Sequence, residues 1–535
     1  MVSSFDGEHL LFTPTASDDD AIPLIFAFPN EYSVGITSLG YQIVWATLTT
    51  RPDLNVSRLF TDAHDPLPSR PEIMGFSFSW ELDYANILDL LDSLDIPLRA
   101  VNRTDAHPIL FGGGPVLTAN PEPYADFFDV ILLGDGELLL NEFIDAYGEV
   151  RGSDRLSILR HLAQVPGIYV PSLYAPLYAD NDGPFEAIAP RFDDVPAQVT
   201  KQTYRGNTLS TSTVVTAKAA WENIYMVEVV RSCPELCRFC LASYLTLPFR
   251  TSPLEESLIP AIDRGLEVTD RLGLLGASVT QHPKFEALLD HLSKPQYDDV
   301  RISIASVRTN TVTPKLADVL TKHDTQSITI AVESGSERVR QIVNKKLETD
   351  AIIAAAHNAK AGGLKSLKLY GMVGIPGEEM DDVEQTAAMM QTIKQQVPGL
   401  KLTLGCSTFV PKSHTPFQWY GVNKQGDKRL KYLQKQLRSK GIDFRPESYK
   451  WSVIQALLSR GDRRLSHVLE QVREYGNSLG SYRRAFKDMK GQLPNIEFYV
   501  HQQWATDQAL PWQHLNGPLP VTTLGKHLED AQSQM

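Results

Sequence analysis

The sequence predicts an α/β protein in which a doubly wound parallel sheet is followed by a partial (β/α)6 barrel and a helical carboxyl-terminal extension. Two observations support this fold class. Short apolar runs alternate with amphipathic segments over residues 20–150, and a second series of six such units begins near Ile224. Apolar runs too short for helices indicate buried strands, and βα alternation is typical of parallel sheets. After about residue 425 the spacing becomes helical.

The first predicted domain, residues 20–150, has glycines at the ends of two strands. Expected strands are 24–29, 73–79, 108–113 and 129–135, and expected helices are 39–50, 81–94 and 137–148. Doubly wound sheets bind ligands at the carboxyl ends of their strands, where "FGGGP" and "LLGDGE" stand. Tight turns that need glycine are an equal interpretation. No G-x-G-x-x-G opens the first helix, which argues against a dinucleotide site.

The second predicted domain, residues 216–425, follows a linker at 151–215 in which we expect one small strand pair. Its expected strands are 224–230, 271–279, 300–306, 327–333, 366–375 and 400–410, with helices at 252–268, 284–292, 314–323 and 381–397. Six βα units in a row fit a curled parallel sheet whose strand tops carry the chemistry. In the helical extension, 426–535, the apolar residues Leu465, Val468, Leu469 and Val472 follow helical spacing.

Composition narrows the class of protein. The 535 residues are 42% hydrophobic and 21% charged, as in ordinary globular proteins, and the net charge is −13. Four cysteines are too few for a disulfide framework and point to a reducing compartment. The start of the chain has no signal-peptide pattern and no apolar run is long enough to span a membrane, so we expect a cytoplasmic protein. The negative charge makes nucleic acid an unlikely partner.

Three of the four cysteines stand in "RSCPELCRFC", residues 231–240, directly after the first strand of the second domain. The spacing is Cys233-x3-Cys237-x2-Cys240. A structural zinc normally takes four Cys or His ligands, and no fourth follows nearby. Iron–sulfur clusters are also bound by thiolates, commonly four. A four-iron cluster held by three thiolates would leave one iron open to an external ligand.

This spacing, placed after the first strand of a six-unit barrel, resembles the radical S-adenosylmethionine (SAM) superfamily. The resemblance implies that Cys233, Cys237 and Cys240 ligate a [4Fe-4S] cluster whose fourth iron is chelated by SAM. One electron from the cluster then cleaves SAM to a 5′-deoxyadenosyl radical. It further implies that Phe239 lies against the adenine and that a reducing partner such as flavodoxin or ferredoxin supplies the electron.

Two later segments support the resemblance and one departs from it. "IAVESGSERV" is similar to the fourth-strand segment of the superfamily and offers the Glu333 carboxylate to SAM. "GMVGIPGE" is similar to the fifth-strand glycine motif, in which Gly371 and Gly374 let adenine approach the backbone. The second strand, however, ends in "LLGASV" and lacks the expected glutamate. Ser278 is a possible substitute for contact with the methionyl amine.

The first domain resembles the cobalamin-binding module of one large radical SAM class. "FPNEYSVGITSLGYQIVWATLTTRPD", "SFSWELDYANILDLLD", "GGGPVLTANPEPYADFFDVILLGDGE" and "FVPKSHTPFQW" together look like an uncharacterised family of cobalamin-binding-domain radical SAM proteins. The similarity implies cobalamin near Gly112, Gly113, Gly114, Gly134 and Gly136. The histidine loop of many cobalamin proteins is absent: "DAHDPL" has His64 but lacks the final glycine. Either no protein histidine binds cobalt, or only the fold is kept.

The leading functional hypothesis is a radical SAM enzyme that abstracts hydrogen from an unidentified substrate, with methyl transfer or rearrangement if cobalamin binds. One alternative is a methylthiotransferase-like or other RNA-modifying radical SAM enzyme, although no cysteines for a second cluster and no basic tail are present. Another is a non-enzymatic iron–sulfur scaffold or redox sensor. Cys406, at the top of the sixth strand, is either a hydrogen-atom donor or a core residue.

Overall fold

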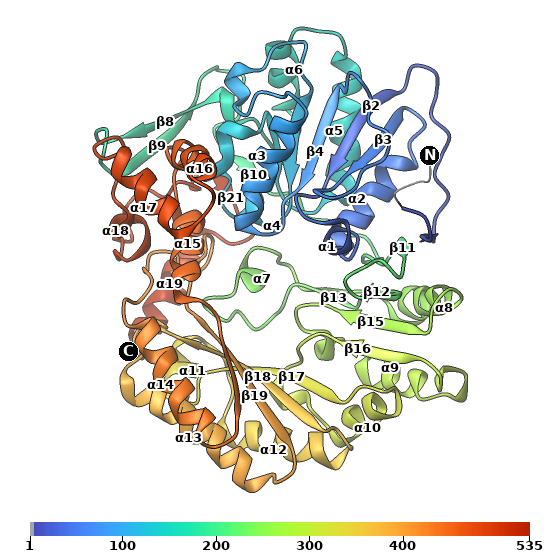
Figure 1. Cartoon of the computed structure of the whole chain (residues 1–535), viewed down its shortest axis with the longest axis vertical. Helices are drawn as coiled ribbons and strands as arrows, with labels where there is room; N and C mark the ends of the chain where they lie inside the picture. Colours follow the sequence, from blue (N-terminus) through green and yellow to red (C-terminus); the bar gives the residue numbers. More distant parts are fainter. Residues whose placement is uncertain (1–4) are drawn as a thin grey trace.

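A six-stranded sheet forms the amino-terminal part of the molecule, at the top of Figure 1. The structure is a computed structural model that describes residues 5–535. The strand order is β3-β2-β4-β5-β6-β7, and only the β6–β7 pair is antiparallel. The strands are β2 (Ile22–Ala27), β3 (Leu54–Leu59), β4 (Ile73–Ser77), β5 (Ile109–Gly113), β6 (Val130–Leu132) and β7 (Ile168–Tyr169). The order reverses between β2 and β4, which creates a crevice at their carboxyl ends.

Helices cover this sheet as expected from the sequence. Helices α2 (Leu39–Thr49) and α5 (Gly136–Val150) contact one another, and α3 (Tyr84–Ser93) packs against the carboxyl-terminal helix α16 (Leu465–Glu474). The four predicted strands and three predicted helices are all present. The α/β class predicted from the sequence is therefore confirmed.

Two strands of this sheet were not predicted. β3 carries Asn55, Ser57 and Arg58, so its apolar run is broken, as edge strands tolerate. β7 has only two residues and lies inside the predicted linker, as does helix α6 (Arg155–Leu162). The remainder of that segment contains the expected strand pair, β8 (Tyr174–Tyr178) with β9 (Phe185–Pro190).

The central part of the chain forms two parallel sheets that contain all six predicted strands. One has the order β12-β15-β16 and the other β17-β18-β19-β20. A single bridge between Val307 and Ile330 joins them. The strands are β12 (Ile224–Glu228), β15 (Arg271–Leu275), β16 (Arg301–Ile304), β17 (Ser327–Glu333), β18 (Ser366–Val373), β19 (Lys401–Thr408) and β20 (Asp443–Pro446). The helices between them are α8 (Ile259–Leu266), α9 (Phe285–Leu292), α10 (Pro314–Lys322), α11 (Glu337–Ile342), α12 (Thr349–Ala361) and α13 (Met380–Gln396).

The carboxyl-terminal extension is mainly helical and packs against the first sheet domain. It contains α14 (Gly426–Arg438), α15 (Tyr449–Arg460), α16, α17 (Leu479–Asp488), α18 (Ile496–Val500) and α19 (Val521–Gln532). The predicted apolar face of α16 is confirmed, since Leu465, Val468, Leu469 and Val472 are fully buried. β20 interrupts the helical pattern and adds a parallel strand beside β19. One apolar core joins α15–α19 to the amino-terminal sheet.

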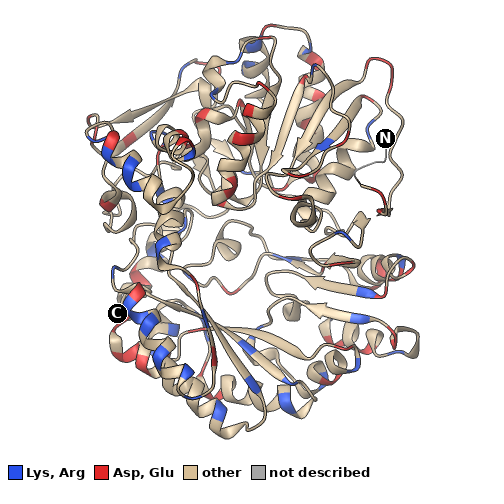
Figure 2. Ribbon diagram, in the orientation of Figure 1, with Lys and Arg blue, Asp and Glu red and all other residues tan. Residues whose placement is uncertain are grey.

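Charged residues are spread over the outer helices, with both signs interspersed (Figure 2). Within residues 5–535, no helix combines the length and the apolar character needed to cross a membrane.

Candidate functional site

The three predicted cluster cysteines lie on the loop between β13 (Val230–Arg231) and α7 (Leu241–Tyr244). The loop turns sharply, with left-handed backbone at Ser232 and Leu236. Asn344, which follows α11, fixes this turn: its Nδ2 donates to the carbonyls of Glu235 at 3.1 Å and Leu236 at 2.9 Å. The segment after the fourth strand of the second domain therefore holds the cysteine loop in place.

The three thiols are close enough to influence one another. Cys237 is buried, and burial is the main reason that its pKa is raised to about 12; the neighbouring Cys240 and Cys233 add to the shift, while Lys345 opposes it. Burial also raises the pKa of Cys240. The four cysteines are all free thiols. No three His, Cys, Asp or Glu side chains of residues 5–535 surround a position suited to a single metal ion.

Glu333 ends β17 beside the cysteine loop, with a left-handed φ of 65°, and is paired with Gly371 of β18 in register. Its carboxylate forms an ion pair with Lys345, in which Nζ lies 2.8 Å from Oε1. Burial lowers the pKa of Lys345, but Glu333 and the Cys237 and Cys240 thiols outweigh it, so the net shift is upward. Lys345 therefore stays charged between a carboxylate and two thiols. Sequence reasoning missed it, because nothing in "VNKKLE" distinguishes a buried lysine from an exposed one.

The end of the second strand places an amide beside the first cysteine. Gln281 Oε1 lies 3.9 Å from Cys233 Sγ, and Gln281 Nε2 donates to Glu235 at 2.5 Å. Ser278, fully buried, donates to the same Gln281 oxygen. Glu235 also pairs with Arg308, which follows β16, at 3.1 Å. Ser278 thus acts on the cysteine loop through Gln281, a residue that the sequence did not single out.

The remaining predicted residues of the second domain lie at the strand tops or in the core. Gly371 and Gly374 are at the end of β18, and Gly374 N donates to Glu378 at 2.6 Å. Phe239 is half-buried against the apolar core. Cys406 is 2% exposed in β19, and its sulfur would lie 3.9 Å from a Cβ at Gly371. Burial holds the pKa of the Cys406 thiol well above its usual value.

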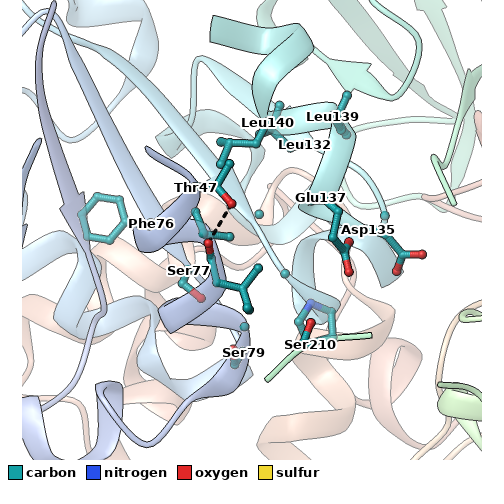
Figure 3. A pocket seen from close by; sticks show the side chains of 18 of the residues that line it. Thr47, Phe76, Ser77, Ser79, Leu132, Asp135, Glu137, Leu139, Leu140 and Ser210 are labelled. Atoms are coloured by element: carbon teal, nitrogen blue, oxygen red, sulfur yellow. Dashed lines mark hydrogen bonds between the residues drawn. The ribbon is translucent and has the colours of Figure 1, made fainter. Parts of the chain in front are cut away.

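The crevice of the first sheet contains a cavity of about 220 Å³ at the carboxyl ends of β2, β4, β5 and β6 (Figure 3). Its walls are the sheet, α2 and α5. Four predicted glycines, Gly113, Gly114, Gly134 and Gly136, line it, whereas Gly112 packs against Leu117 and Phe128. The apolar wall consists of Phe26, Ile43, Val44, Phe76, Phe111, Leu132, Leu139 and Leu140. His64 is not among the described residues that line it; its Nδ1 is within 2.7 Å of the Asp65 carbonyl oxygen.

An ionic network connects this cavity with the cysteine loop. Arg231 lines the cavity and immediately precedes the loop. It pairs with Glu137 at 2.6 Å and Glu228 at 2.7 Å, while Arg250 pairs with Asp135 at 2.5 Å. Burial raises the pKa of Asp135, but Arg231 and Arg250 outweigh it and the net shift is downward. Charge pairing therefore joins the two domains at the point where both predicted sites meet.

Comparisons with known proteins agree with this geometry. Residues 227–390 match the model of the radical SAM superfamily, and residues 68–171 match that of the N-terminal region of radical SAM proteins. An uncharacterized protein of Methanocaldococcus jannaschii, MJ0966, is 28% identical over 83% of this chain and 89% of its own length. An uncharacterized methyltransferase of Pyrococcus horikoshii, PH0819, is 25% identical over 54% of this chain and 61% of its own.

A likeness in fold extends over most of the chain. The structure of TsrM from Kitasatospora setae, a radical SAM methyltransferase solved with cobalamin and a [4Fe-4S] cluster, covers 88% of this chain and 99% of that one, with a TM-score of 0.52 and 10% identity. Residues 227–390 thus form a radical SAM domain, which confirms the resemblance predicted from the sequence, and the protein is an enzyme of the radical SAM type.

Proposed function

We propose that this protein is a cobalamin-dependent radical SAM enzyme that transfers a methyl group to, or rearranges, a substrate not yet identified. The observation that carries the proposal is Arg231, which lines the cavity of the first sheet and leads directly into the cysteine loop. Two similar proteins support methyl transfer: PH0819 is named a methyltransferase, and TsrM is described as one. In this proposal the first domain spans 20–150 with β7, and the two central parallel sheets make the partial barrel of residues 216–425.

The cysteine loop has the donors that a cluster with one open iron needs. Cys233, Cys237 and Cys240 would supply three thiolates, and Lys345 would offset part of their negative charge. The buried Cys237 favours its protonated form, so cluster assembly must displace that proton. Loop hydrogen bonds from Asn344 hold the backbone before any cluster binds.

SAM would be held by side chains from several strand tops. Gln281 Oε1, beside Cys233, is an acceptor for the methionyl ammonium, with Ser278 orienting the amide. Glu333 would bind a polar group of SAM, although it must share its carboxylate with Lys345. Phe239, Gly371 and Gly374 would face the adenine, as the superfamily resemblance implies.

The cavity of the first sheet fits the tail of cobalamin. Its volume of about 220 Å³ and its apolar wall would accommodate a flat aromatic group. Gly113, Gly114, Gly134 and Gly136 bring backbone close to that opening. No histidine is found among the described residues that line it, which supports cobalamin bound without a protein histidine on cobalt.

When bound, the cluster supplies the electron that cleaves SAM to a radical, and cobalamin supplies a methyl carrier. The chain would position these groups at the boundary between the two domains. Arg231 and Arg250 lower the pKa of Asp135 at that boundary, and Arg231 also pairs with Glu137 at 2.6 Å.

The proposal is tested with anaerobically reconstituted protein, hydroxocobalamin, SAM and a strong reductant. We expect retained cobalamin and SAM turnover measured as 5′-deoxyadenosine or S-adenosylhomocysteine. Cluster binding without any SAM turnover would support the scaffold or sensor alternative. Metabolites of cells with and without the gene should differ by the mass of one methyl group, whereas a mass change confined to RNA would favour the RNA-modifying alternative.

A further inference from the structure

The inner face of the central sheets, which points away from the helices, is open at β18. Leu367 and Leu369 belong to the apolar core shared with the helices, so Lys368 and Tyr370, which alternate with them, lie on the inner face. Tyr370 is 41% exposed, although β18 has β17 on one side and β19 on the other. Parallel sheets are normally covered on both faces. The inner face therefore borders a space that residues 5–535 leave unfilled at this level.

A cavity of about 460 Å³ opens on the same face, between the amino ends of β16 and β17. Ser303, Ser327 and Thr329 line it, and in each strand they alternate with core residues. Thr329 is in register with Lys368, so the inner face continues from the cavity to β18. None of the residues proposed above to bind the cluster, SAM or cobalamin lines this cavity.

Tyr370 lies flat enough on its neighbour to serve as a stacking surface. Gly405 of β19 is in register with it, and a Cβ at position 405 would lie only 3.2 Å from the tyrosine ring. Glycine at this position therefore lets the ring pack closely against the next strand. Lys368 Nζ donates to the Tyr370 hydroxyl at 3.1 Å and lies 4.7 Å from the ring centroid. The ring is thus held at its hydroxyl end and against β19, and its remaining surface is exposed.

Positive charge on the inner face has no counter-charge in the described chain. Within residues 5–535, Arg271, Arg301 and Lys368 form no ion pair with a carboxylate. Arg271 and Arg301 begin β15 and β16 in register, and like charges on neighbouring strands repel one another. Arg301 also lines the cavity, where Asp324 is the one carboxylate among the described lining residues. Lys368 has three N–H groups and uses one on Tyr370, so two stay available for an anion.

The position of Tyr370 relates this surface to the predicted SAM site. Tyr370 directly precedes Gly371 of the glycine motif, and its register partner Ala331 stands two residues before Glu333. Since a strand rises about 3.3 Å per residue, the ring lies roughly 7 Å below the level of Glu333. A molecule stacked on Tyr370 would therefore lie beneath SAM and not in its place.

We propose that the inner face of the barrel binds the substrate through a planar group stacked on Tyr370 and an anionic group, phosphate or carboxylate, held by Lys368. The exposed ring selects a flat partner, and the unpaired cations Lys368, Arg271 and Arg301 select a negative charge. The assignment to the substrate rests on the proposed function, because it places this site beneath SAM. The binding of a planar anion does not.

The test uses three probes with one ring system, 2-naphthyl phosphate, 2-naphthoate and 2-naphthamide. They are compared by equilibrium dialysis against the full-length, cluster-loaded protein without SAM or cobalamin. We expect one anion per chain with a Kd below about 1 mM and about 10-fold weaker binding of the neutral amide, since a charge-assisted hydrogen bond is lost. The tighter of the two anions identifies the charged group as phosphate or carboxylate.

Two variants locate the binding. Lys368→Met keeps the length of the side chain and should bring both anions to the affinity of naphthamide, whereas Tyr370→Leu should weaken all three probes by about 5-fold. The matched control is Lys435→Met, an exposed lysine on the outer helix α14, which should change no affinity. Iron content and circular dichroism check that each variant folds. Naphthamide binding as tight as that of the anions, or anion binding that Lys368→Met does not weaken, would overturn the site.

A measurement in cells tests the assignment to the substrate. Cells that carry Lys368→Met should lack the metabolite that differs by the mass of one methyl group, and cells that carry Lys435→Met should keep it. A normal amount of that metabolite with Lys368→Met would show that the substrate binds elsewhere, which overturns the assignment. If the natural protein cleaves no SAM, the proposed function fails, and the dialysis still decides whether the planar anion binds here.

Discussion

Gln281 ends the short turn Val279–Gln281 after β15 and lies beside the first cluster cysteine. Its Oε1 is 3.9 Å from Cys233 Sγ, so a ligand of the iron beside Cys233 would meet an amide oxygen. The amide oxygen can accept a hydrogen bond from an ammonium group, but the amide is neutral and forms no ion pair with it. The neighbouring Glu235 is neutralised by Arg308 and hydrogen-bonded by Gln281 Nε2.

Replacing Gln281 by Leu should therefore weaken SAM binding by about 10-fold, the usual worth of a charge-assisted hydrogen bond. Gln281→Glu loses the hydrogen bond to Glu235 and places two carboxylates against one another, so it should bind SAM no more tightly than the natural protein. Both affinities are measured by equilibrium dialysis, with iron content as the check on the cluster. Unchanged affinity in Gln281→Leu would assign the methionyl amine to another residue.

The cluster assignment depends on three thiols that lie together on one loop. Changing Cys233, Cys237 and Cys240 together to Ala should abolish the brown iron–sulfur absorbance and the bound iron after anaerobic reconstitution. Cys406→Ser is the matched control, because Cys406 belongs to the core of β19. Iron retained by the triple variant would contradict the assignment. If Cys406→Ser also leaves SAM cleavage and product formation unchanged, Cys406 is a core residue only.

At the scale of elements, the two glycines that follow β6 are under different structural constraints. Gly134 has a φ of 112°, and a Cβ there would lie 2.0 Å from the Gln202 carbonyl oxygen. Gly136 opens α5, and its Cβ would meet only Val44 at 3.8 Å. The backbone conformation and the nearby Gln202 therefore require glycine at position 134, as the turn interpretation predicts. No such constraint acts on Gly136, which lines the cavity.

Gly134→Ala should destabilise the fold by about 1–3 kcal/mol, through the left-handed backbone and the clash with Gln202. Gly136→Ala should leave the thermal midpoint within about one degree, because surface changes without strain cost little. Thermal unfolding followed by circular dichroism compares the two. If Gly136→Ala lowered the thermal midpoint as much as Gly134→Ala, the first turn of α5 would be more tightly packed than the structure shows.

Sequence patterns predicted the strands in which apolar residues recur regularly. In the second domain β12 is a continuous buried run, whereas β17 and β18 alternate buried and more exposed residues, and all six predicted strands are present. Three strands were not predicted: β3, β7 and β20. An edge strand with polar residues, or a strand of only a few residues, has too short an apolar pattern to recognise. The cysteine loop was visible as a spacing. Lys345 and Gln281 were not, because their roles come from contacts that only the fold creates: Gln281 meets Cys233 across 48 residues, and Lys345 pairs with Glu333 across 12.

At the scale of the whole molecule, the first domain and the extension are one structural unit. They share an apolar core, and buried pairs such as Arg463 with Glu122 and the hydroxyls of Tyr84 and Tyr482 join them. The cysteine loop is held between this unit and the central sheets. Removing the extension would expose that core, so the sites are studied on the full chain.

Cobalamin binding tests whether the cavity of the first sheet is a cofactor site and whether a histidine binds cobalt there. We expect the protein to retain hydroxocobalamin through gel filtration, and electron paramagnetic resonance of the cob(II)alamin form to show no nitrogen superhyperfine splitting from a histidine. His64→Ala should change neither result, because His64 is exposed in a loop outside the cavity. Splitting that disappears in His64→Ala would refute ligation without histidine. No retained cobalamin would mean that the domain has kept only the fold.

Arg231 is the residue at which the two proposed cofactor sites meet. It contacts Asp135 and Glu137 of the first domain, and Glu228 at the end of β12. Its side chain is 14% exposed and the three carboxylates are 12–19% exposed, so removing it leaves them poorly compensated at a largely buried boundary. Arg250 still pairs with Asp135 at 2.5 Å and offsets part of this loss.

Arg231→Met should therefore lower stability by about 3 kcal/mol and reduce cobalamin affinity and cluster content together. The matched control is Arg151→Met, which removes a more exposed arginine paired with Glu72, with side chains 33% and 31% exposed, and should change neither cofactor. Cobalamin is measured by equilibrium dialysis, the cluster by iron and sulfide analysis, and stability by thermal unfolding. If Arg231→Met impairs only one cofactor, the network belongs to that site alone, and the two sites are neighbours without being energetically linked through this residue.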